Sequence, residues 1–283
     1  MKPMIKYSGG KSREICCFEQ YIPKCYDRYI EPFVGGGGLF FYLEPSNAII
    51  NDVNSRVYSF YQEMKDCYFV AREQLNRLQV EYTINQTRFE LLRHRNPTEH
   101  IINKNEQLYY QMRDMFNHKI PSEYLDCVIY FFINKTAYSG MIRYNSGGDF
   151  NVPFGRYVNF NTQLLTEYHH SLLQQTSIYN QDYSSIFNMA KNNDFMFLDP
   201  PYDCKFSDYG NINFTGDFGE DAHIKLANDF KQLSCKALMV IGKTKFIEDL
   251  YKPYIVAEYD KHYSVNIKNR FNQDAKHIVI CNY

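Results

Sequence analysis

The sequence predicts an α/β protein in which a doubly wound, mostly parallel sheet is interrupted by a helical insertion. Two observations lead to this prediction. Apolar runs of strand length alternate with helical stretches near both ends of the sequence, as in parallel sheets covered by helices. Between about residues 54 and 160 the alternation stops, and long helical patterns take its place. At 283 residues the chain is long enough for one large domain or two small ones.

The first part of the sheet is predicted from residues 28–52. Residues 28–33 have the character of a short strand and run into the glycine-rich segment 34–38. A helical stretch, residues 39–43, precedes a second strand at residues 47–52 that ends on a carboxylate. Strand, glycine-rich turn, helix and strand in this order open many doubly wound sheets. Four later runs predict further buried strands, at residues 177–182, 194–199, 236–242 and 277–281, with a helix at residues 221–233.

The insertion is predicted to consist of helices that lead into a β-hairpin. Residues 54–81 and 87–119 carry helical periodicity and dense charge, and their one helix breaker is Pro97. Another helix is expected to start at Pro121-Ser-Glu-Tyr124 and to run through residues 125–134. Two extended arms then flank Asn145-Ser-Gly-Gly148, which is a hairpin pattern. The expected division is a sheet domain of residues 1–54 and 161–283 and an insertion of residues 55–160 that ends in a hairpin at residues 136–154.

Composition and charge exclude several classes of protein. The chain is 45% hydrophobic and 22% charged, as in soluble globular proteins, and no apolar run is long enough to cross a membrane. Eight cysteines are scattered without a Cys-x-x-Cys pair or zinc-ligand spacing, so we expect reduced thiols, no metal site and a cytoplasmic location. Lysine plus arginine total 31 against 32 acids, so the overall charge does not indicate a nucleic-acid partner. A local surplus of Lys135, Arg143 and Arg156 over Asp149 would attract a polyanion.

The glycine run and the acid after the next strand point to a nucleoside ligand. Four successive glycines, residues 35–38, let the backbone approach a ligand closely and adopt positive φ angles. Asp52 ends the second strand, where a carboxylate can hold ribose hydroxyls. This pattern alone does not separate a dinucleotide from S-adenosylmethionine.

A second pattern, Asp199-Pro-Pro-Tyr202, is more specific. It follows a predicted buried strand, at the sheet edge where open α/β sheets bind their ligands. The two prolines restrict the backbone, so the Asp199 carboxylate, the Pro200 carbonyl and the Tyr202 ring are expected to face one small space. A planar amino group fits that space, because the two oxygens accept its hydrogens while the aromatic ring stacks on the heterocycle. The pattern therefore predicts methyl transfer to an exocyclic amino nitrogen.

Five motifs together resemble the Dam-type, D12 class of DNA adenine-N6 methyltransferases. They are Ile5-Lys-Tyr-Ser-Gly-Gly-Lys11, Glu31-Pro-Phe-Val-Gly-Gly-Gly37, Asn51-Asp-Val-Asn54, Asn151-Val-Pro-Phe-Gly155 and Asp199-Pro-Pro-Tyr202. The resemblance implies a Rossmann-like class I methyltransferase fold with a mostly parallel seven-stranded sheet. It also implies S-adenosylmethionine as cofactor, S-adenosylhomocysteine as product, duplex DNA as partner and the insertion as the target-recognition domain. A bacterial or phage origin and a cognate restriction endonuclease as a functional partner are further expectations.

The resemblance implies roles for individual residues in the methyl-transfer site. The catalytic residues would be Asp199, Pro200, Tyr202 and Lys11. The cofactor-binding residues would be Tyr7, Lys11, Phe33, Gly35, Gly37, Asp52, Asp182, Tyr183 and Asp199. Tyr7 stands where many relatives carry Trp. As a lone acid at a strand end, Asp182 also fits a helix N-cap.

By the same resemblance, the predicted hairpin contacts DNA. The implied residues are Tyr138, Ser139, Met141, Arg143, Asn145 and Pro153. Tyr138 would wedge into the base stack as the target adenine flips out, and the Arg143 guanidinium would read a base edge. Ser139 stands where Dam itself usually has Asn, so the expected site is GATC or a close variant.

Three alternative functions remain open at this point. An NAD-dependent oxidoreductase would explain the glycine loop and Asp52 but would leave Asp199-Pro-Pro-Tyr202 without a role. The same chemistry on RNA adenine or on the N4 atom of cytosine fits the pocket equally well, and the predicted hairpin favours duplex DNA. A DNA-binding module without catalysis would not need Asp199 and Tyr202.

Overall fold

The computed structural model describes residues 1–202, 218–261 and 275–283, which fall into two compact units. We call residues 1–10 and 54–174 the helical unit. The sheet unit contains the remaining described residues, 11–53, 175–202, 218–261 and 275–283.

The two units divide the chain differently from the predicted domains in two segments. The sequence places residues 1–10 and 161–174 with the sheet, whereas in the structure both belong to the helical unit. The Lys6 amide donates to Asn134 Oδ1 at 2.8 Å, and Asn134 Nδ2 donates to the Lys6 carbonyl at 2.7 Å. His169 Nε2 lies 2.9 Å from the carbonyl oxygen of Lys2. These contacts join segments that are far apart in sequence, which local patterns do not reveal.

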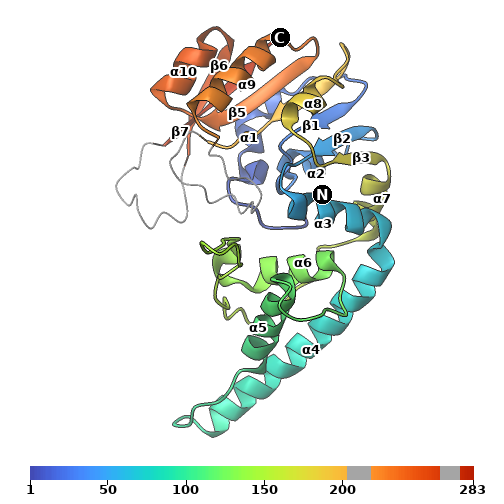
Figure 1. Ribbon diagram of the computed structural model, residues 1–283, viewed down its shortest axis with the longest axis vertical. Helices are drawn as coiled ribbons and strands as arrows, with labels where there is room; N and C mark the ends of the chain where they lie inside the picture. The colour runs from blue at the N-terminus through green and yellow to red at the C-terminus, as the bar shows by residue number, and fades with distance from the viewer. Residues whose placement is uncertain (203–217, 262–274) are drawn as a thin grey trace. The chain divides into compact units, whose positions relative to one another are not determined.

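The sheet unit is built on a seven-stranded sheet in the order β3-β2-β1-β4-β5-β7-β6 (Figure 1). The five strands from β3 to β5 pair in parallel, and β7 runs antiparallel to both β5 and β6. This confirms the predicted mostly parallel α/β sheet. Strand β6 is not among the predicted strands; it lies at the edge of the sheet, and its residues alternate between half-buried and exposed. The strands are β1 (Tyr29–Glu31), β2 (Ala48–Asn51), β3 (Thr176–Tyr179), β4 (Phe195–Leu198), β5 (Lys236–Gly242), β6 (Ile255–Asp260) and β7 (Lys276–Cys281).

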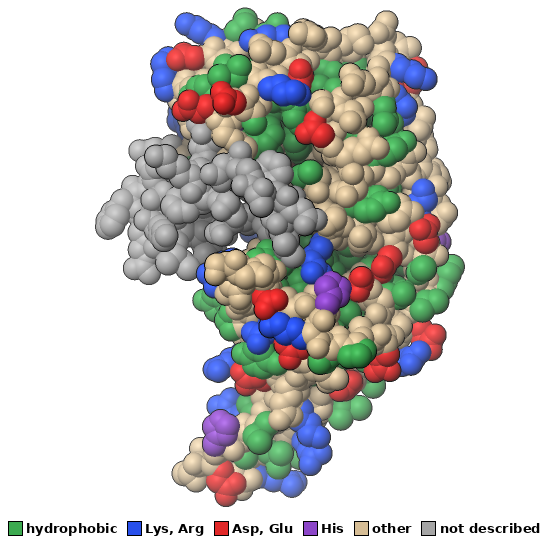
Figure 2. Space-filling model, viewed as in Figure 1, with side chains coloured by type: hydrophobic (Ala, Val, Ile, Leu, Met, Phe, Trp, Pro, Cys, Tyr) green, Lys and Arg blue, Asp and Glu red, His purple; other side chains and the backbone are tan. Residues whose placement is uncertain are grey.

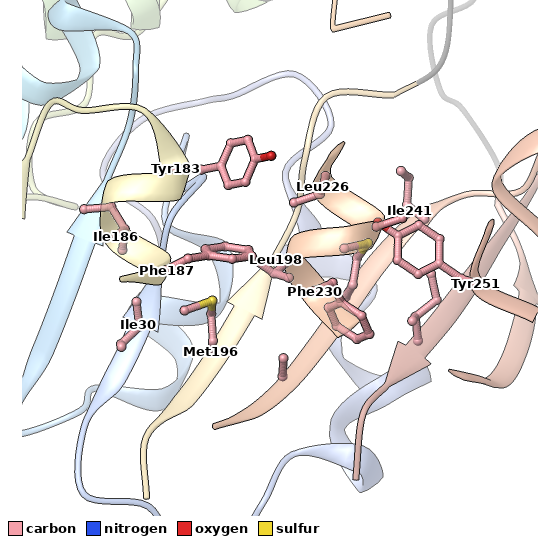
Figure 3. Close-up of a cluster of buried hydrophobic side chains, with 14 of the residues drawn as sticks. Ile30, Tyr183, Ile186, Phe187, Met196, Leu198, Leu226, Phe230, Ile241 and Tyr251 are labelled. Atoms are coloured by element: carbon pink, nitrogen blue, oxygen red, sulfur yellow. The ribbon is translucent and has the colours of Figure 1, made fainter. Parts of the chain in front are cut away.

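Three helices cover one face of this sheet, namely α8 (Tyr183–Phe187), α9 (Glu220–Gln232) and α10 (Lys245–Tyr251) (Figure 1). Phe187, Phe230 and Tyr251 from these helices pack into one cluster with Met196 of β4 and Ile241 of β5 (Figure 3). All five side chains are buried. Burying an aromatic or aliphatic side chain of this size contributes roughly 1.5–3 kcal/mol, so the cluster holds the strands firmly in place.

The other face of the sheet is covered by α1 (Ile15–Phe18) and α2 (Gly38–Leu43). Phe18 stacks on Phe197 of β4 with ring centroids 5.6 Å apart, and Phe40 stacks on Tyr29 of β1 at 6.4 Å. Because side chains alternate along a strand, Met196 and Phe197 of β4 serve opposite faces. Both faces are therefore apolar, which explains the continuous hydrophobic runs in the sequence.

The helical unit contains α3 (Ser55–Asp66), α4 (Tyr68–Arg95), α5 (Lys104–Phe116), α6 (Asp126–Thr136) and α7 (Glu167–Gln174). The two helical stretches that the sequence predicts, residues 54–81 and 87–119, are joined in the structure, because α4 continues through residues 82–86. No glycine or proline interrupts that stretch, and the Thr83 hydroxyl donates to the Gln79 carbonyl inside the helix. Helix α4 ends at Arg95, just before Pro97. Cys67 separates α4 from the preceding helix, α3.

The predicted hairpin at residues 136–154 forms only in part. Its arms pair antiparallel at two isolated bridges, Ala137 with Phe154 and Tyr144 with Phe150, instead of forming two regular strands. A 3₁₀ turn, Tyr138–Gly140, interrupts the first arm, and Ser139 in it has a positive φ of 55°. We call residues 137–154 the recognition arms. Other 3₁₀ turns lie at Lys11–Arg13, Glu19–Tyr21 and Lys252–Tyr254.

No helix in residues 1–202, 218–261 or 275–283 has the length and apolarity required to span a membrane.

Candidate active site

Three acidic residues lie at the carboxyl ends of adjacent parallel strands in the sheet unit. Glu31 is the last residue of β1, Asp52 follows β2, and Asp199 follows β4. Parallel strands end at the same edge of a sheet, and this edge is where doubly wound proteins bind their ligands. Asp52 and Asp199, the two acids that the sequence predicts to be functional, therefore lie at the same edge of the sheet.

Lys11 connects the first motif to the Asp199-Pro-Pro-Tyr202 segment. Its ammonium group donates to Asp199 Oδ1 and, at 2.7 Å, to the Tyr202 hydroxyl. Lys11 is buried, while the Asp199 side chain keeps 19% of its surface exposed and so remains accessible to a substrate. Burial raises the pKa of the Asp199 carboxyl, and the charge and hydrogen bond of Lys11 offset this rise only in part.

The ring of Tyr202 lies over Gly242, the last residue of β5. A Cβ atom at Gly242 would lie 3.7 Å from the tyrosine ring, which is ordinary van der Waals contact and shows how closely the ring approaches this strand. His277 of β7 meets the ring edge-on, with centroids 5.3 Å apart and an interplanar angle of 79°. These contacts fix one side of the ring that the sequence predicts to stack on a base.

His277 also belongs to a buried cluster of charged side chains. The Glu14 carboxylate accepts hydrogen bonds from the Tyr259 hydroxyl at 2.8 Å and from Lys261, and it is 2.7 Å from His277 Nδ1. Neither Glu14 nor His277 is among the functional residues predicted from the sequence. No local signal marks them, because they meet only when α1, β6 and β7 are assembled.

The glycine loop and Asp52 form the second part of the site. Gly35 and Gly37 adopt positive φ angles of 46° and 68°, which side chains disfavour. The Gly35 amide donates to Asp52 Oδ2 at 2.9 Å, so the buried carboxylate is held against the loop. A tight loop of backbone amides beside a carboxylate is the environment that a nucleoside requires, and these residues therefore fit S-adenosylmethionine.

Glu31 is a buried acid to which the sequence analysis gave no role. Its Oε2 accepts a hydrogen bond from the Tyr29 hydroxyl at 2.7 Å. Burial, followed by the negative charges of Asp199 and Asp52, raises the pKa of Glu31 well above its ordinary value. Burial therefore favours the protonated form of Glu31, which lies at the same edge as the two other acids. Its place directly before Pro32-Phe33 in the glycine motif is the signal that could have identified it.

Phe33 and Tyr183 form an aromatic pair, with ring centroids 5.4 Å apart. Tyr183 is buried, and its hydroxyl donates to Asp229 of α9 at 2.9 Å. Asp182 is exposed, and its Oδ1 accepts a hydrogen bond from the Ser184 amide at 2.9 Å. Asp182 therefore caps the N-terminus of α8, which is one of the two roles that the sequence predicts for it. Its predicted contact with the cofactor stays a prediction.

Tyr7 belongs to the helical unit, where it is half-buried. Its role as an aromatic wall of the cofactor site therefore stays a prediction.

The recognition arms in the helical unit expose alternate side chains. Phe150, Val152 and Phe154 are buried, while Asn151 and Pro153 between them are exposed. The arms are anchored to α5, because the Tyr109 hydroxyl donates to the Val152 carbonyl at 2.7 Å and Phe116 packs on Phe150.

The predicted DNA-contacting residues differ in how they are held within these arms. Tyr138 is 52% exposed, Arg143 is exposed and Met141 is half-buried. The Tyr138 amide donates to the Pro153 carbonyl at 2.9 Å. Asn145 is exposed, yet its Oδ1 accepts the amides of Gly147 and Asp149, both at 2.9 Å, and so stabilises the turn.

Lys135, in the last turn of α6, is a further cation next to the recognition arms in sequence. Its ammonium group lies 5.0 Å from the centroid of the Phe131 ring. Burial, and to a smaller extent the charge of Lys6, lowers the pKa of Lys135 to about 8. Its charge is therefore sensitive to mild alkali.

Comparison with known proteins assigns the chain to a family. Residues 7–267 match the family of D12 class N6 adenine-specific DNA methyltransferases. The chain is 35% identical to the Type II methyltransferase M.CviBI of Paramecium bursaria Chlorella virus NC1A over all of both chains. It is 30% identical to the Type II methyltransferase M.MjaIII of Methanocaldococcus jannaschii, covering 100% of this chain and 99% of the relative.

A third relative is the DNA adenine methylase of Escherichia coli K12, which is 28% identical over 79% of this chain and 74% of its own length. The matched range includes the glycine loop, the Asp199-Pro-Pro-Tyr202 segment and the recognition arms. The chain is therefore an enzyme of the D12 class of N6 adenine-specific DNA methyltransferases.

Proposed function

We infer that this enzyme transfers a methyl group from S-adenosylmethionine to the N6 atom of an adenine in duplex DNA, within GATC or a close variant. The observation that carries this proposal is the contact of Lys11 with both Asp199 and Tyr202 at the carboxyl edge of the sheet. An acceptor, a cation and an aromatic ring are thereby brought together at one place.

The cofactor would be held by the glycine loop and Asp52. Asp52 would accept from the ribose hydroxyls, the Gly35 and Gly37 backbone would leave room for the chain of the cofactor, and Phe33 with Tyr183 would line its side. Asp182 and Tyr7 would complete these contacts. S-adenosylmethionine, when bound, supplies a methyl group on a positively charged sulfur.

The chain's own residues act on the amino group of the target base. The Asp199 carboxylate and the Pro200 carbonyl accept its two hydrogens, and Tyr202 stacks on the ring. These hydrogen bonds draw the nitrogen lone pair out of conjugation, which makes N6 more nucleophilic. As the new nitrogen–carbon bond forms, Asp199 is the nearest group to accept the proton that N6 releases. Lys11 keeps Asp199 ionised and oriented before that step, since its positive charge opposes the effect of burial on the carboxyl pKa.

The recognition arms would enter the DNA. Tyr138 would fill the space left by the flipped adenine, and Arg143 would form a bidentate contact with a base edge. Ser139, Met141, Asn145 and Pro153 would contribute further contacts. Because Asn145 Oδ1 is engaged in the turn, its amide nitrogen is the group available to donate to DNA.

The distribution of charge supports a local rather than a general attraction to DNA. Figure 2 shows basic and acidic side chains interspersed on the face in view, in keeping with the net charge of −1. Contacts to phosphates would therefore come from individual cations, and the recognition arms would supply the specificity. The Type II names of the relatives further favour a cognate restriction endonuclease as a functional partner.

Methylation-detecting sequencing of DNA from cells that express the chain tests this proposal. We expect N6-methyladenine in one short palindromic site, absent when the Asp199→Asn variant is expressed. N4-methylcytosine, or methylation confined to RNA, would contradict the assignment of the substrate. Tyr202→Phe should keep a measurable rate in vitro and Tyr202→Ala should lose most of it, because the ring stacks while the hydroxyl contacts Lys11.

A further inference from the structure

Gly242, His277 and Tyr259 form a row across three neighbouring strands of the sheet, β5, β7 and β6. Gly242 of β5 pairs with His277 of β7, and His277 pairs with Tyr259 of β6. Residues that pair in this way place their side chains on the same face. The Tyr202 ring lies next to Gly242 and contacts His277 in a T-shaped arrangement. His277 in turn meets Tyr259 edge-on, with centroids 5.6 Å apart.

The carboxylate of Glu14 contacts two members of this row, His277 and Tyr259. It is 2.7 Å from His277 Nδ1, accepts from the Tyr259 hydroxyl at 2.8 Å, and binds Lys261. Burial acts to raise the pKa of Glu14. The hydrogen bonds from His277 and Lys261 and the charge of Lys11 outweigh burial and bring the pKa down to about 2. Glu14 is therefore ionised at neutral pH and keeps these partners fixed.

The backbone of Glu14, as distinct from its carboxylate, also closes the turn that carries Lys11. Glu14 follows the 3₁₀ turn Lys11–Arg13, and its amide donates to the Lys11 carbonyl at 2.8 Å. Lys11 extends from this turn to Asp199 and Tyr202. Two connections therefore run from Glu14 to the pocket, one along the backbone to Lys11 and one through His277 to the Tyr202 ring.

We propose that Glu14 and His277 are positioning residues for methyl transfer: Glu14 clamps His277, and the imidazole edge holds the Tyr202 ring in the orientation that stacks on the target base. The inference rests on the proposed function, because it needs Tyr202 to contact the base. Buried ion pairs of this kind contribute little net stability compared with apolar packing, since removing charges from water is costly. Fixed placement of the Tyr202 ring gives this buried cluster a functional role.

The test compares His277→Leu with His277→Phe and Glu14→Gln under single-turnover conditions. Misplacing a reacting or stacking group costs up to about 100-fold in rate, so we expect His277→Leu and Glu14→Gln to lower the rate about tenfold. His277→Phe restores a ring edge and should recover most of the rate. The dissociation constant for S-adenosylmethionine should stay within about twofold in all three, because no member of the cluster is assigned to the cofactor.

A matched control and a double-mutant cycle separate positioning from general stability. Glu258, on the same strand as Tyr259, also binds two lysines, Lys243 and Lys276, yet it is exposed. Glu258→Gln should leave the rate unchanged. If His277 acts through the ring, His277→Leu should have little further effect in a Tyr202→Ala background. Thermal unfolding and cofactor binding identify any variant that fails to fold.

Each outcome of these experiments either supports or contradicts the positioning role of Glu14 and His277. Independent, multiplicative losses from His277→Leu and Tyr202→Ala would overturn it, as would a full rate in His277→Leu or no recovery in a folded His277→Phe. Failure of the proposed function is a different result: the wild-type chain would then methylate no DNA adenine, or Tyr202→Ala would retain its rate. Loss of rate in Tyr202→Ala with unchanged His277 variants would contradict only the positioning role.

Discussion

The proposed methyl-transfer site and the recognition arms are held by different means. In the pocket, Lys11 is buried and bonded to Asp199 and Tyr202, and both follow a strand enclosed by two helical layers. In the arms, Tyr138 and Arg143 are exposed and lie on a backbone with two isolated bridges. A pocket for a single amino group needs fixed distances, whereas a surface that reads DNA has to fit a large and deformable partner. We therefore expect substitutions in the pocket to change rate and those in the arms to change choice of sequence.

The largest expected effect is that of Asp199→Asn. The amide keeps the shape but offers one acceptor oxygen and no charge, so the rate should fall at least about 100-fold. The dissociation constant for S-adenosylmethionine, measured by calorimetry, should change little. Asp194 is a matched control, because it lies before the opposite end of β4 and binds Arg28 at 2.7 Å. Asp194→Asn should lower the thermal midpoint and leave the rate per folded molecule unchanged; an Asp199→Asn enzyme with near-normal turnover would contradict the assigned role.

The pH dependence of the rate provides a second view of Asp199. Its folded-state pKa is raised above the ordinary value of 3.8, so the acceptor is lost by protonation at a higher pH than for a typical aspartate. The single-turnover rate should therefore decline on the acid side of neutrality, as pH falls through this raised pKa. In Asp199→Asn the acid decline should disappear from the residual rate, and a decline that persists would come from another group.

The second largest effect concerns Asp52 and the cofactor. Loss of a charged hydrogen bond costs about 1.5–3 kcal/mol, so Asp52→Ala should weaken S-adenosylmethionine binding about tenfold or more. Asp52→Asn retains an acceptor for the Gly35 amide and should lose less, which separates support of the loop from contact with the ribose. Calorimetry measures both variants, and equal dissociation constants for wild type and Asp52→Ala would remove the acid from the cofactor site.

A smaller and qualitatively different effect is expected from Arg143→Ala. An arginine that reads a base contributes about 1–3 kcal/mol of discrimination, so its loss should relax the methylated site. Arg156 is the matched control, since it is also an exposed arginine of the helical unit. Arg156→Ala should weaken binding to all sequences alike. If Arg143→Ala lowered rates on every sequence by one common factor, Arg143 would be a phosphate contact, and Ser139, Met141 or Pro153 would have to carry the specificity.

The smallest expected effect is that of Lys135 on pH-dependent DNA binding. Because the folded pKa of Lys135 is about 8, its charge is lost between pH 7 and pH 9. One fewer cation near a phosphate should weaken DNA binding by about two- to threefold at low salt. Lys135→Arg keeps its charge over this range and should abolish this part of the pH dependence in a fluorescence-anisotropy titration. Identical pH profiles for the two proteins would place Lys135 away from the DNA.

The sequence predicts the sheet and much of the pocket because their signals are local. The glycine run, Asp52 and Asp199-Pro-Pro-Tyr202 each follow a strand, so pattern alone locates them at one edge. Helix boundaries at Pro97 follow from proline chemistry in the same way. These features need no knowledge of distant contacts.

Other features depend on contacts between segments that are far apart. Glu14 and His277 meet across 263 positions of sequence, and neither carries a local motif. Strand β6 alternates exposed and half-buried residues and carries charges that its neighbours neutralise, so it lacks the buried apolar run of the inner strands. The hairpin pattern is weakened by Ser139, whose left-handed backbone forms a 3₁₀ turn where a strand is predicted.

The position of β7 in the sheet has a consequence for how the protein is made. It has the highest residue numbers of the seven strands, yet it lies inside the sheet between β5 and β6. During synthesis the ribosome therefore releases β6 before the strand that attaches it to β5. Until β7 emerges, His277 is missing, and the row behind Tyr202 stays incomplete. A chain that terminates at residue 261 would lack this inner strand, so premature termination should yield an inactive fragment instead of a partly active methyltransferase.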